Sequence, residues 1–242
     1  MNALWSIARR DLLAAFGSPL AWLVLACWAF VTNGWFVFLV LYPIHGTQGS
    51  EQPLFVDTLG VGVVLLTLLA PALTMNSFAS ERSQGTMQLL LTVPVREIHL
   101  VLGKFLAAWL ILGALVAATF AQIAVLVLVS AIQVPHLVAG YLGLLLTCAF
   151  FAGLGVWISI LVDSVVAAYV LTFGAIAVLL LVSAVGQVGA LGWINRGFSL
   201  MDRARPFFTG EIRLAGIAWF VAGTAAFLTL AHAALCARRI HG

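Results

Sequence analysis

Charged residues are scarce in this chain. Only 8% of its 242 residues are Asp, Glu, Lys or Arg, and 64% are hydrophobic, whereas a soluble domain carries roughly 25% charged residues. This shortage excludes an ordinary soluble protein and predicts an integral membrane protein. The net charge of +3 is small and dispersed, so the chain also lacks the basic surface with which proteins bind nucleic acid. We expect no nucleic-acid partner.

Cysteine is also rare, and a common nucleotide-binding motif is missing. The three cysteines, Cys27, Cys148 and Cys236, lie far apart in apolar stretches without CxxC spacing. We therefore predict free thiols, and neither a metal nor a redox site. The sequence contains no G-x-x-x-x-G-K-[ST] loop, the motif that binds the phosphates of ATP. We expect no cofactor in this chain, and energy from ATP would have to come through a partner.

Long apolar runs make up most of the sequence. They are continuous rather than alternating, which favours membrane-spanning helices over a β-barrel. A helix needs about 20 apolar residues to cross a bilayer. Six runs reach this length: residues 19–41, 54–78, 104–129, 137–161, 165–186 and 214–236. The sequence therefore predicts an all-α, polytopic membrane protein in which residues 1–242 form one transmembrane domain.

The segment before the first span, residues 2–17, is amphipathic. Arg9 and Arg10 lie off its apolar helical face. That face comprises Leu4, Trp5, Ala8, Leu12 and Phe16. The pattern is typical of a helix that lies in the membrane interface, and a Gly-Ser-Pro sequence at residues 17–19 then separates it from the first span. The alternative is a simple positively charged anchor.

The distribution of Lys and Arg predicts the orientation. With both termini in the cytoplasm, seven basic residues lie inside and four outside, which agrees with the positive-inside rule. The inside set is Arg9, Arg10, Arg82, Arg96, Lys104, Arg238 and Arg239, and the outside set is Arg196, Arg203, Arg205 and Arg213. The outer segment 187–213 also contains Phe207 and Phe208. We expect short interfacial helices there, with these rings at headgroup depth.

A polar segment, residues 81–94, separates the second and third apolar runs. Gly85 and Thr86 form a plausible helix start, because a threonine hydroxyl can accept hydrogen bonds from the following amides. Met87, Leu90 and Leu91 then lie on one helical face, and a proline ends the segment. The pattern predicts a short cytoplasmic helix with an apolar face that fits a groove on a soluble partner. The alternative is an amphipathic loop resting on the membrane.

Few ionisable groups fall inside the predicted spans. Asp57 lies near the outer end of the second span and His232 near the inner end of the sixth. Charged groups in a membrane are costly and therefore suspected of function, but no Ser-His-Asp set or pair of histidines with metal spacing accompanies these two. We predict that the chain is not an enzyme and has no catalytic residue.

The polar segment resembles a motif of the type-2 ATP-binding-cassette (ABC) exporter permeases. Members carry a charged pair, Gly-Thr, a double leucine, a proline and Gly-Lys in this order between their second and third spans. The corresponding residues here are Glu81, Arg82, Gly85, Thr86, Leu89, Leu90, Pro94, Gly103 and Lys104. The N-terminal segment and residues 18–22 also look like the family's elbow helix. The chain is most similar to the branch that includes permeases for gliding motility and nitrous oxide reductase maturation, except in the outer segment.

This resemblance implies that residues 81–94 are the coupling helix, which contacts a separate ATPase subunit. The residues that take this role are Glu81, Arg82, Gly85, Thr86, Leu89 and Leu90. The inner turn at Asp163 and Ser164 would be a second, minor contact. The implied partners are two ABC ATPase subunits that carry ATP and Mg²⁺, a second permease copy or paralogue, and the lipid of a bacterial inner membrane.

The resulting prediction is a permease subunit that couples ATP hydrolysis in its partner to export of an unidentified substrate. One alternative is a mechanical transmitter that acts on a periplasmic protein without moving a substrate. Another is an ion-coupled secondary transporter, although the sequence lacks the deep carboxylate that such a protein would use.

Overall fold

The computed structural model describes residues 3–41, 52–83, 85, 96–122, 134–185 and 197–241. All regular secondary structure in this part of the chain is helical. Six helical stretches are long and apolar enough to cross a membrane. The predicted fold class, an all-α protein with six membrane spans, is thereby confirmed.

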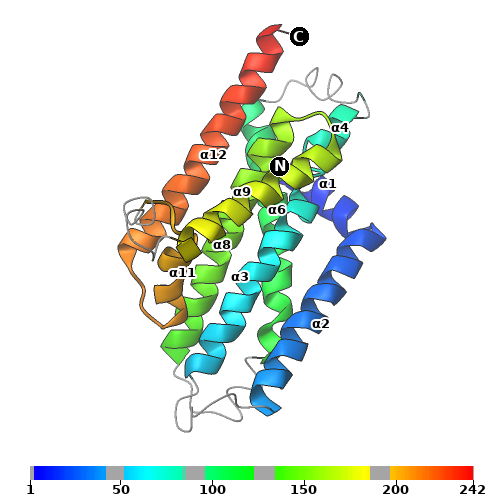
Figure 1. Cartoon of the computed structure of the whole chain (residues 1–242). Coiled ribbons are helices and arrows are strands. Elements are labelled where there is room, and N and C mark those ends of the chain that lie inside the picture. The colour runs from blue at the N-terminus through cyan, green and yellow to red at the C-terminus, as the bar shows by residue number, and fades with distance from the viewer. Residues whose placement is uncertain are drawn as a thin grey trace.

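The helices largely follow the predicted apolar runs (Figure 1). Their bounds are α1 Ala3–Phe16, α2 Pro19–Leu41, α3 Gln52–Thr74, α4 Ala79–Ser83, α6 Glu97–Ala118, α8 Val134–Leu161, α9 Val165–Val185, α11 Leu200–Phe208 and α12 Leu214–His241. The largest difference is at α6, which begins at Glu97 and not at residue 104. The predicted span began too far along the chain because Lys104 interrupts the apolar pattern. In the folded chain the Lys104 ammonium is buried against acidic partners. Residues 123–129 of the predicted third span lie outside the described part.

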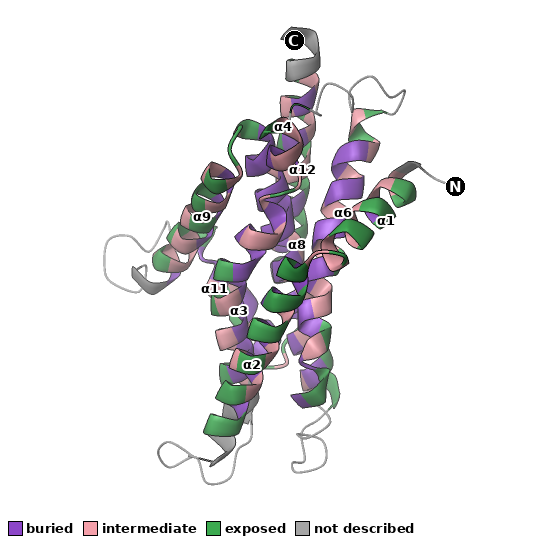
Figure 2. Ribbon diagram, turned by 90° about the vertical axis from the view of Figure 1, so that its right-hand side faces the viewer, coloured by how far each residue is buried: buried purple, intermediate pink, exposed green. Residues whose placement is uncertain are grey.

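Helix α8 occupies the centre of the bundle. In the apolar part of α8 that could cross a membrane, 72% of the residues are buried, compared with 17% for α9 and 22% for α12. Figure 2 shows buried positions along the length of α8. Glycines allow its neighbours to approach closely. A Cβ at Gly143 would lie 2.6 Å from Cβ of Phe207, and one at Gly155 would overlap the side chain of Thr74. Close packing of this kind is typical of helices in membranes.

The second span is interrupted by a turn between α3 and α4. Helix α3 ends at Thr74, after a proline at position 71, and α4 begins at Ala79. Ser159 of α8 supports the interruption, because its buried hydroxyl accepts hydrogen bonds from the amides of Phe78 and Ala79, both 2.9 Å long. One buried serine thus satisfies two of the amides that a helix start leaves without a partner.

The outer segment differs from expectation in its aromatic residues. Phe207 and Phe208, in α11, are 0% and 2% exposed, and α11 packs against α8, α3 and α9. They therefore pack in the protein core and are not exposed to lipid headgroups. Gly143 of α8 and Gly216 of α12 leave the space that Phe207 fills, a complementarity between distant segments that local sequence does not reveal. Phe198 is exposed, and residues 187–196 lie outside the described part.

Helices α1 and α4 and the end of α12 lie in the same half of the bundle (Figures 1 and 2). This agrees with an even number of spans. The assignment of that side to the cytoplasm still rests on the Lys and Arg distribution and stays a prediction.

Candidate functional site

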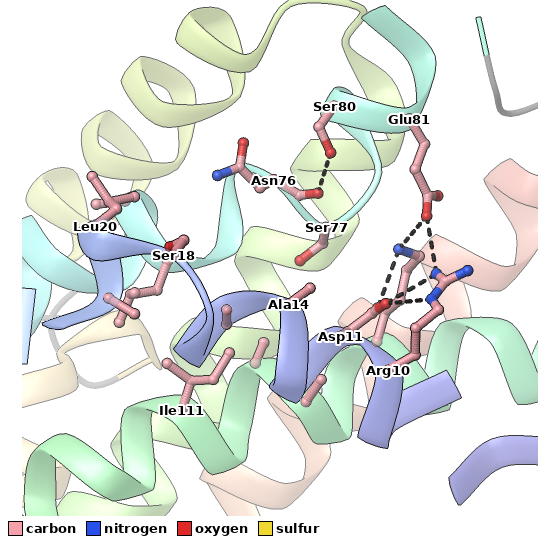
Figure 3. A pocket seen from close by; sticks show the side chains of 17 residues that line it. Arg10, Asp11, Ala14, Ser18, Leu20, Asn76, Ser77, Ser80, Glu81 and Ile111 are labelled. Carbon is pink, nitrogen blue, oxygen red and sulfur yellow. Dashed lines mark hydrogen bonds and ion pairs between the residues drawn. The ribbon is translucent and has the colours of Figure 1, made fainter. Parts of the chain in front are cut away.

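Four charged side chains meet where α1, α4 and α6 come together. Lys104 Nζ lies 2.9 Å from Glu81 Oε1 and 3.3 Å from Asp11 Oδ2. Arg10 Nη2 lies 2.9 Å from Asp11 Oδ1 and 3.2 Å from Glu81 Oε1. Figure 3 shows Glu81 of α4 facing Arg10 and Asp11 of α1. We call Arg10, Asp11, Glu81 and Lys104 the charge cluster; its two positive and two negative charges cancel.

Lys104 is the buried centre of the charge cluster. Its side chain is 3% exposed, and its ammonium lies 4.9 Å from the centroid of the Phe78 ring. A buried ammonium is costly unless it is paired and hydrogen-bonded. Two carboxylates and an aromatic face meet this requirement here. These partners explain how an apolar helix accommodates the charge of Lys104.

Close packing of α1 on α6 brings the opposite charges together. A Cβ added to Gly103 would lie 3.0 Å from the side chain of Ile7 and 3.1 Å from the carbonyl oxygen of Leu4. The bare backbone of Gly103 thus lets α1 lie directly on α6, which places Asp11 beside the next residue, Lys104. Substitution of Gly103 by a larger residue would separate the two helices at this point.

The charge cluster also changes the protonation equilibrium of Arg10. Partial burial alone would lower the pKa of its guanidinium, but the hydrogen bond to Asp11 and the negative charges of Asp11 and Glu81 outweigh this and raise the pKa above its ordinary value. Arg10 is charged at physiological pH like any arginine, and the cluster makes loss of its proton still less favourable.

Arg82, the neighbour of Glu81, contacts a different part of the bundle. Its guanidinium forms an ion pair with Asp163 and donates a 3.3 Å hydrogen bond to the carbonyl oxygen of Ile160. Ile160 lies in the last turn of α8, and Asp163 lies in the turn that joins α8 and α9. The amide of Ala167 donates to the Ser164 hydroxyl at 3.5 Å, so this serine caps the start of α9. The structure thus joins two regions that the sequence singled out separately, the polar segment and the turn at residues 163–164.

The polar segment itself is described only at its start. Glu81 and Arg82 lie in α4, which precedes the predicted helix start. Gly85 has a φ of 70°, a left-handed conformation that favours glycine, and its amide donates to the Arg82 carbonyl oxygen at 3.0 Å. Thr86, Leu89 and Leu90 lie outside the described residues, so the predicted coupling helix stays a prediction.

A cavity of about 420 Å³ adjoins the charge cluster, between α1, α2, α3, α4 and α6. All four cluster residues line it (Figure 3). Ser18, Asn76 and Ser77 contribute polar groups, and alanines, leucines and Ile111 form the apolar part of the wall.

Sequence reasoning missed the role of Arg10 and Asp11 and the burial of Lys104. The available signals were an acidic residue next to two arginines in an amphipathic helix and a lysine within an otherwise apolar stretch. Such isolated charges predict that partners exist. They do not show which residues the partners are.

Comparisons with known proteins agree with the resemblance found in the sequence. Residues 5–198 match the family described as ABC-2 family transporter protein. The chain is also similar to the "Probable ABC transporter permease protein NosY" of Pseudomonas aeruginosa, with 32% identity over 163 residues, or 63% of this chain. The aligned part corresponds to 58% of the length of that relative. Because the family match covers most of the chain, from α1 into the segment before α11, the predicted kinship with type-2 ABC permeases is confirmed and the chain belongs to the ABC-2 family of transporter proteins.

Proposed function

We propose that a separate ATPase subunit drives this permease through residues 81–94, and that the charge cluster passes the movement to the bundle. As an ABC-2 family member, the chain is a multi-pass transmembrane subunit of an ABC transporter, a kind of subunit that is generally non-catalytic and associates with ABC ATPases.

The observation that carries the proposal is that two adjacent residues of α4 form ion pairs with different parts of the bundle. Glu81 contacts Lys104 of α6 and Arg10 of α1, whereas Arg82 contacts Asp163 in the turn between α8 and α9. A force applied to the residues after α4 would therefore act on α1 and α6 through Glu81 and on the turn between α8 and α9 through Arg82. A loop that merely joins two spans would not need ion pairs to both of these places.

ATP-driven closure of two ATPase subunits would shift the bundle between conformations by pulling on this segment. In that scheme ATP and Mg²⁺ are bound by the partner, and the charge cluster keeps α1, α4 and α6 together as they move. We further propose that the transported substrate is exported, as the family resemblance implies. The largely exposed α9 and α12 offer apolar faces to a second permease copy and to lipid.

The coupling surface can be tested on the apolar stripe of the predicted helix. Leu90→Ser, on the stripe, should reduce co-purification of the ATPase subunit by about tenfold or more, which corresponds to about 1.4 kcal/mol of binding free energy. Gln88→Ser is the matched control, because residue 88 is two positions from Leu90 and would lie off the apolar stripe of a helix; it should leave co-purification unchanged. Equal recovery of the ATPase with both variants, together with unchanged ATPase activity, would refute the proposed contact.

A further inference from the structure

Three side chains with metal-binding chemistry meet away from the charge cluster. Glu97 is the first residue of α6, and His232 and Cys236 lie four residues apart on α12. One ligand atom of each residue lies within 4.8 Å of the ligand atoms of the other two. All three residues are half-buried, so an ion could reach them from the aqueous end of the bundle.

The spacing of the histidine and the cysteine fits a tetrahedral metal site. Residues four apart on a helix share one face, and Cys236 Sγ lies 3.6 Å from His232 Nε2 and 3.9 Å from Nδ1. In a zinc site with Zn–S near 2.3 Å and Zn–N near 2.0 Å, the sulfur and nitrogen ligands are about 3.6 Å apart. The distance from Sγ to Nε2 already has this value. Because Sγ also lies close to Nδ1, it sits beside the ring, and the imidazole must turn to direct Nε2 at an ion shared with the sulfur.

The type of ligand selects the ion. A thiolate, an imidazole and a carboxylate are all ligands of Zn²⁺, whereas Mg²⁺ and Ca²⁺ prefer oxygen ligands alone. When Cys236 loses its thiol proton on binding, the thiolate and the Glu97 carboxylate together balance the two charges of the ion. A neutral site suits the end of a membrane helix, where an unbalanced charge is costly.

We propose that Glu97, His232 and Cys236 bind one Zn²⁺ ion, with water in the fourth position, and that the ion links the start of α6 to the end of α12. Helix α12 packs mainly on α8 and less on α6, so the ion would add a direct connection between two helices that otherwise touch little. This site uses none of the residues on which the proposed coupling depends.

Direct measurement of zinc tests the site. The full chain, purified in detergent under reducing conditions with a histidine-free tag, should retain about one Zn²⁺ per chain when it competes with a chromophoric chelator. His232→Ala and Cys236→Ser should each weaken zinc binding at least tenfold. Cys27→Ser and His99→Gln are matched controls, because they remove a thiol of α2 and an imidazole of α6 that do not belong to the site, and both should bind zinc like the unmodified chain. Loss of zinc in either control, or no stoichiometric zinc in the unmodified chain, would overturn the proposal.

Two further measurements identify the ligands. Co²⁺ in place of Zn²⁺ should produce the near-ultraviolet charge-transfer absorption that a thiolate ligand causes, and this absorption should be absent in Cys236→Ser and present in Cys27→Ser. In the unmodified chain, Zn²⁺ should slow alkylation of Cys236 about tenfold and leave alkylation of Cys27, which lies on the outer surface of a spanning helix, unchanged. This second measurement needs no variant to fold. Equal alkylation of Cys236 with and without zinc, or a charge-transfer band that survives in Cys236→Ser, would refute the assignment.

Discussion

The ammonium of Lys104 lies 2.9 Å from the carboxylate of Glu81, although 23 positions separate them in the sequence. The polar segment lies between these two residues. The ion pair therefore holds the beginning of the polar segment, at Glu81, against α6, the helix that follows the segment. Any movement of the segment must either carry α6 along or break this buried contact.

Glu81→Gln should destabilise the protein through the lysine that it leaves behind. Breaking a buried ion pair by removing one partner costs about 3 kcal/mol or more, and Asp11, which also contacts Lys104, should reduce this cost. A double-mutant cycle with Lys104→Met, followed by thermal unfolding in detergent, measures the effect. The double variant should lose less stability than the sum of the single variants. Additive losses would show that the two side chains do not interact.

Arg82→Asp should affect coupling far more than stability. The side chains of Arg82 and Asp163 are 28% and 71% exposed, and such exposed pairs contribute at most about 1 kcal/mol. We expect near-normal unfolding but reduced stimulation of ATPase activity by the permease. The charge-swapped double variant Arg82→Asp/Asp163→Arg should recover at least half of the lost stimulation. If the swap is as inactive as the single variant, the ion pair is not the element that transmits movement.

Gly155→Ala should loosen the contact between α3 and α8. The new methyl group would overlap Thr74, and overpacking of this kind costs about 1–3 kcal/mol. Gly174→Ala on α9 is the matched control, because a Cβ there meets nothing within 4 Å. The control should be neutral or stabilising by up to about 1 kcal/mol, since alanine favours a helix more than glycine. Equal unfolding temperatures of the two variants would contradict the close approach of α3 to α8.

Ser159→Ala should weaken the turn between α3 and α4. It leaves the amides of Phe78 and Ala79 without their acceptor, and an unsatisfied buried group costs about 1–3 kcal/mol. Thr147→Val on the same helix is a suitable comparison, because the buried Thr147 hydroxyl donates only to the Gly143 carbonyl of its own helix. Hydrogen exchange should increase at residues 75–82 in Ser159→Ala and stay unchanged in Thr147→Val. Unaltered exchange in Ser159→Ala would show that the serine does not hold the turn.

The order and type of the spanning helices could be predicted from the sequence. Helix α2 runs over Pro19–Leu41 as expected, and α9 begins at Val165 as expected and follows its prediction to Val185, the last described residue there. Both predictions succeed because the length of an apolar run and the residues that interrupt it are local properties. The polar segment and its family motif are equally local, and the family match agrees with them.

Only the tertiary structure decided which charges meet and which aromatic rings are buried. Asp11 and Lys104 are 93 positions apart, and they meet because α1 packs on the bare backbone of Gly103. Phe207 is buried because glycines on two other helices leave room for it. Hydrophobicity along the chain specifies that a segment enters the membrane, but ion pairing and close packing depend on the shapes of two surfaces at once, and those surfaces exist only after the helices have assembled.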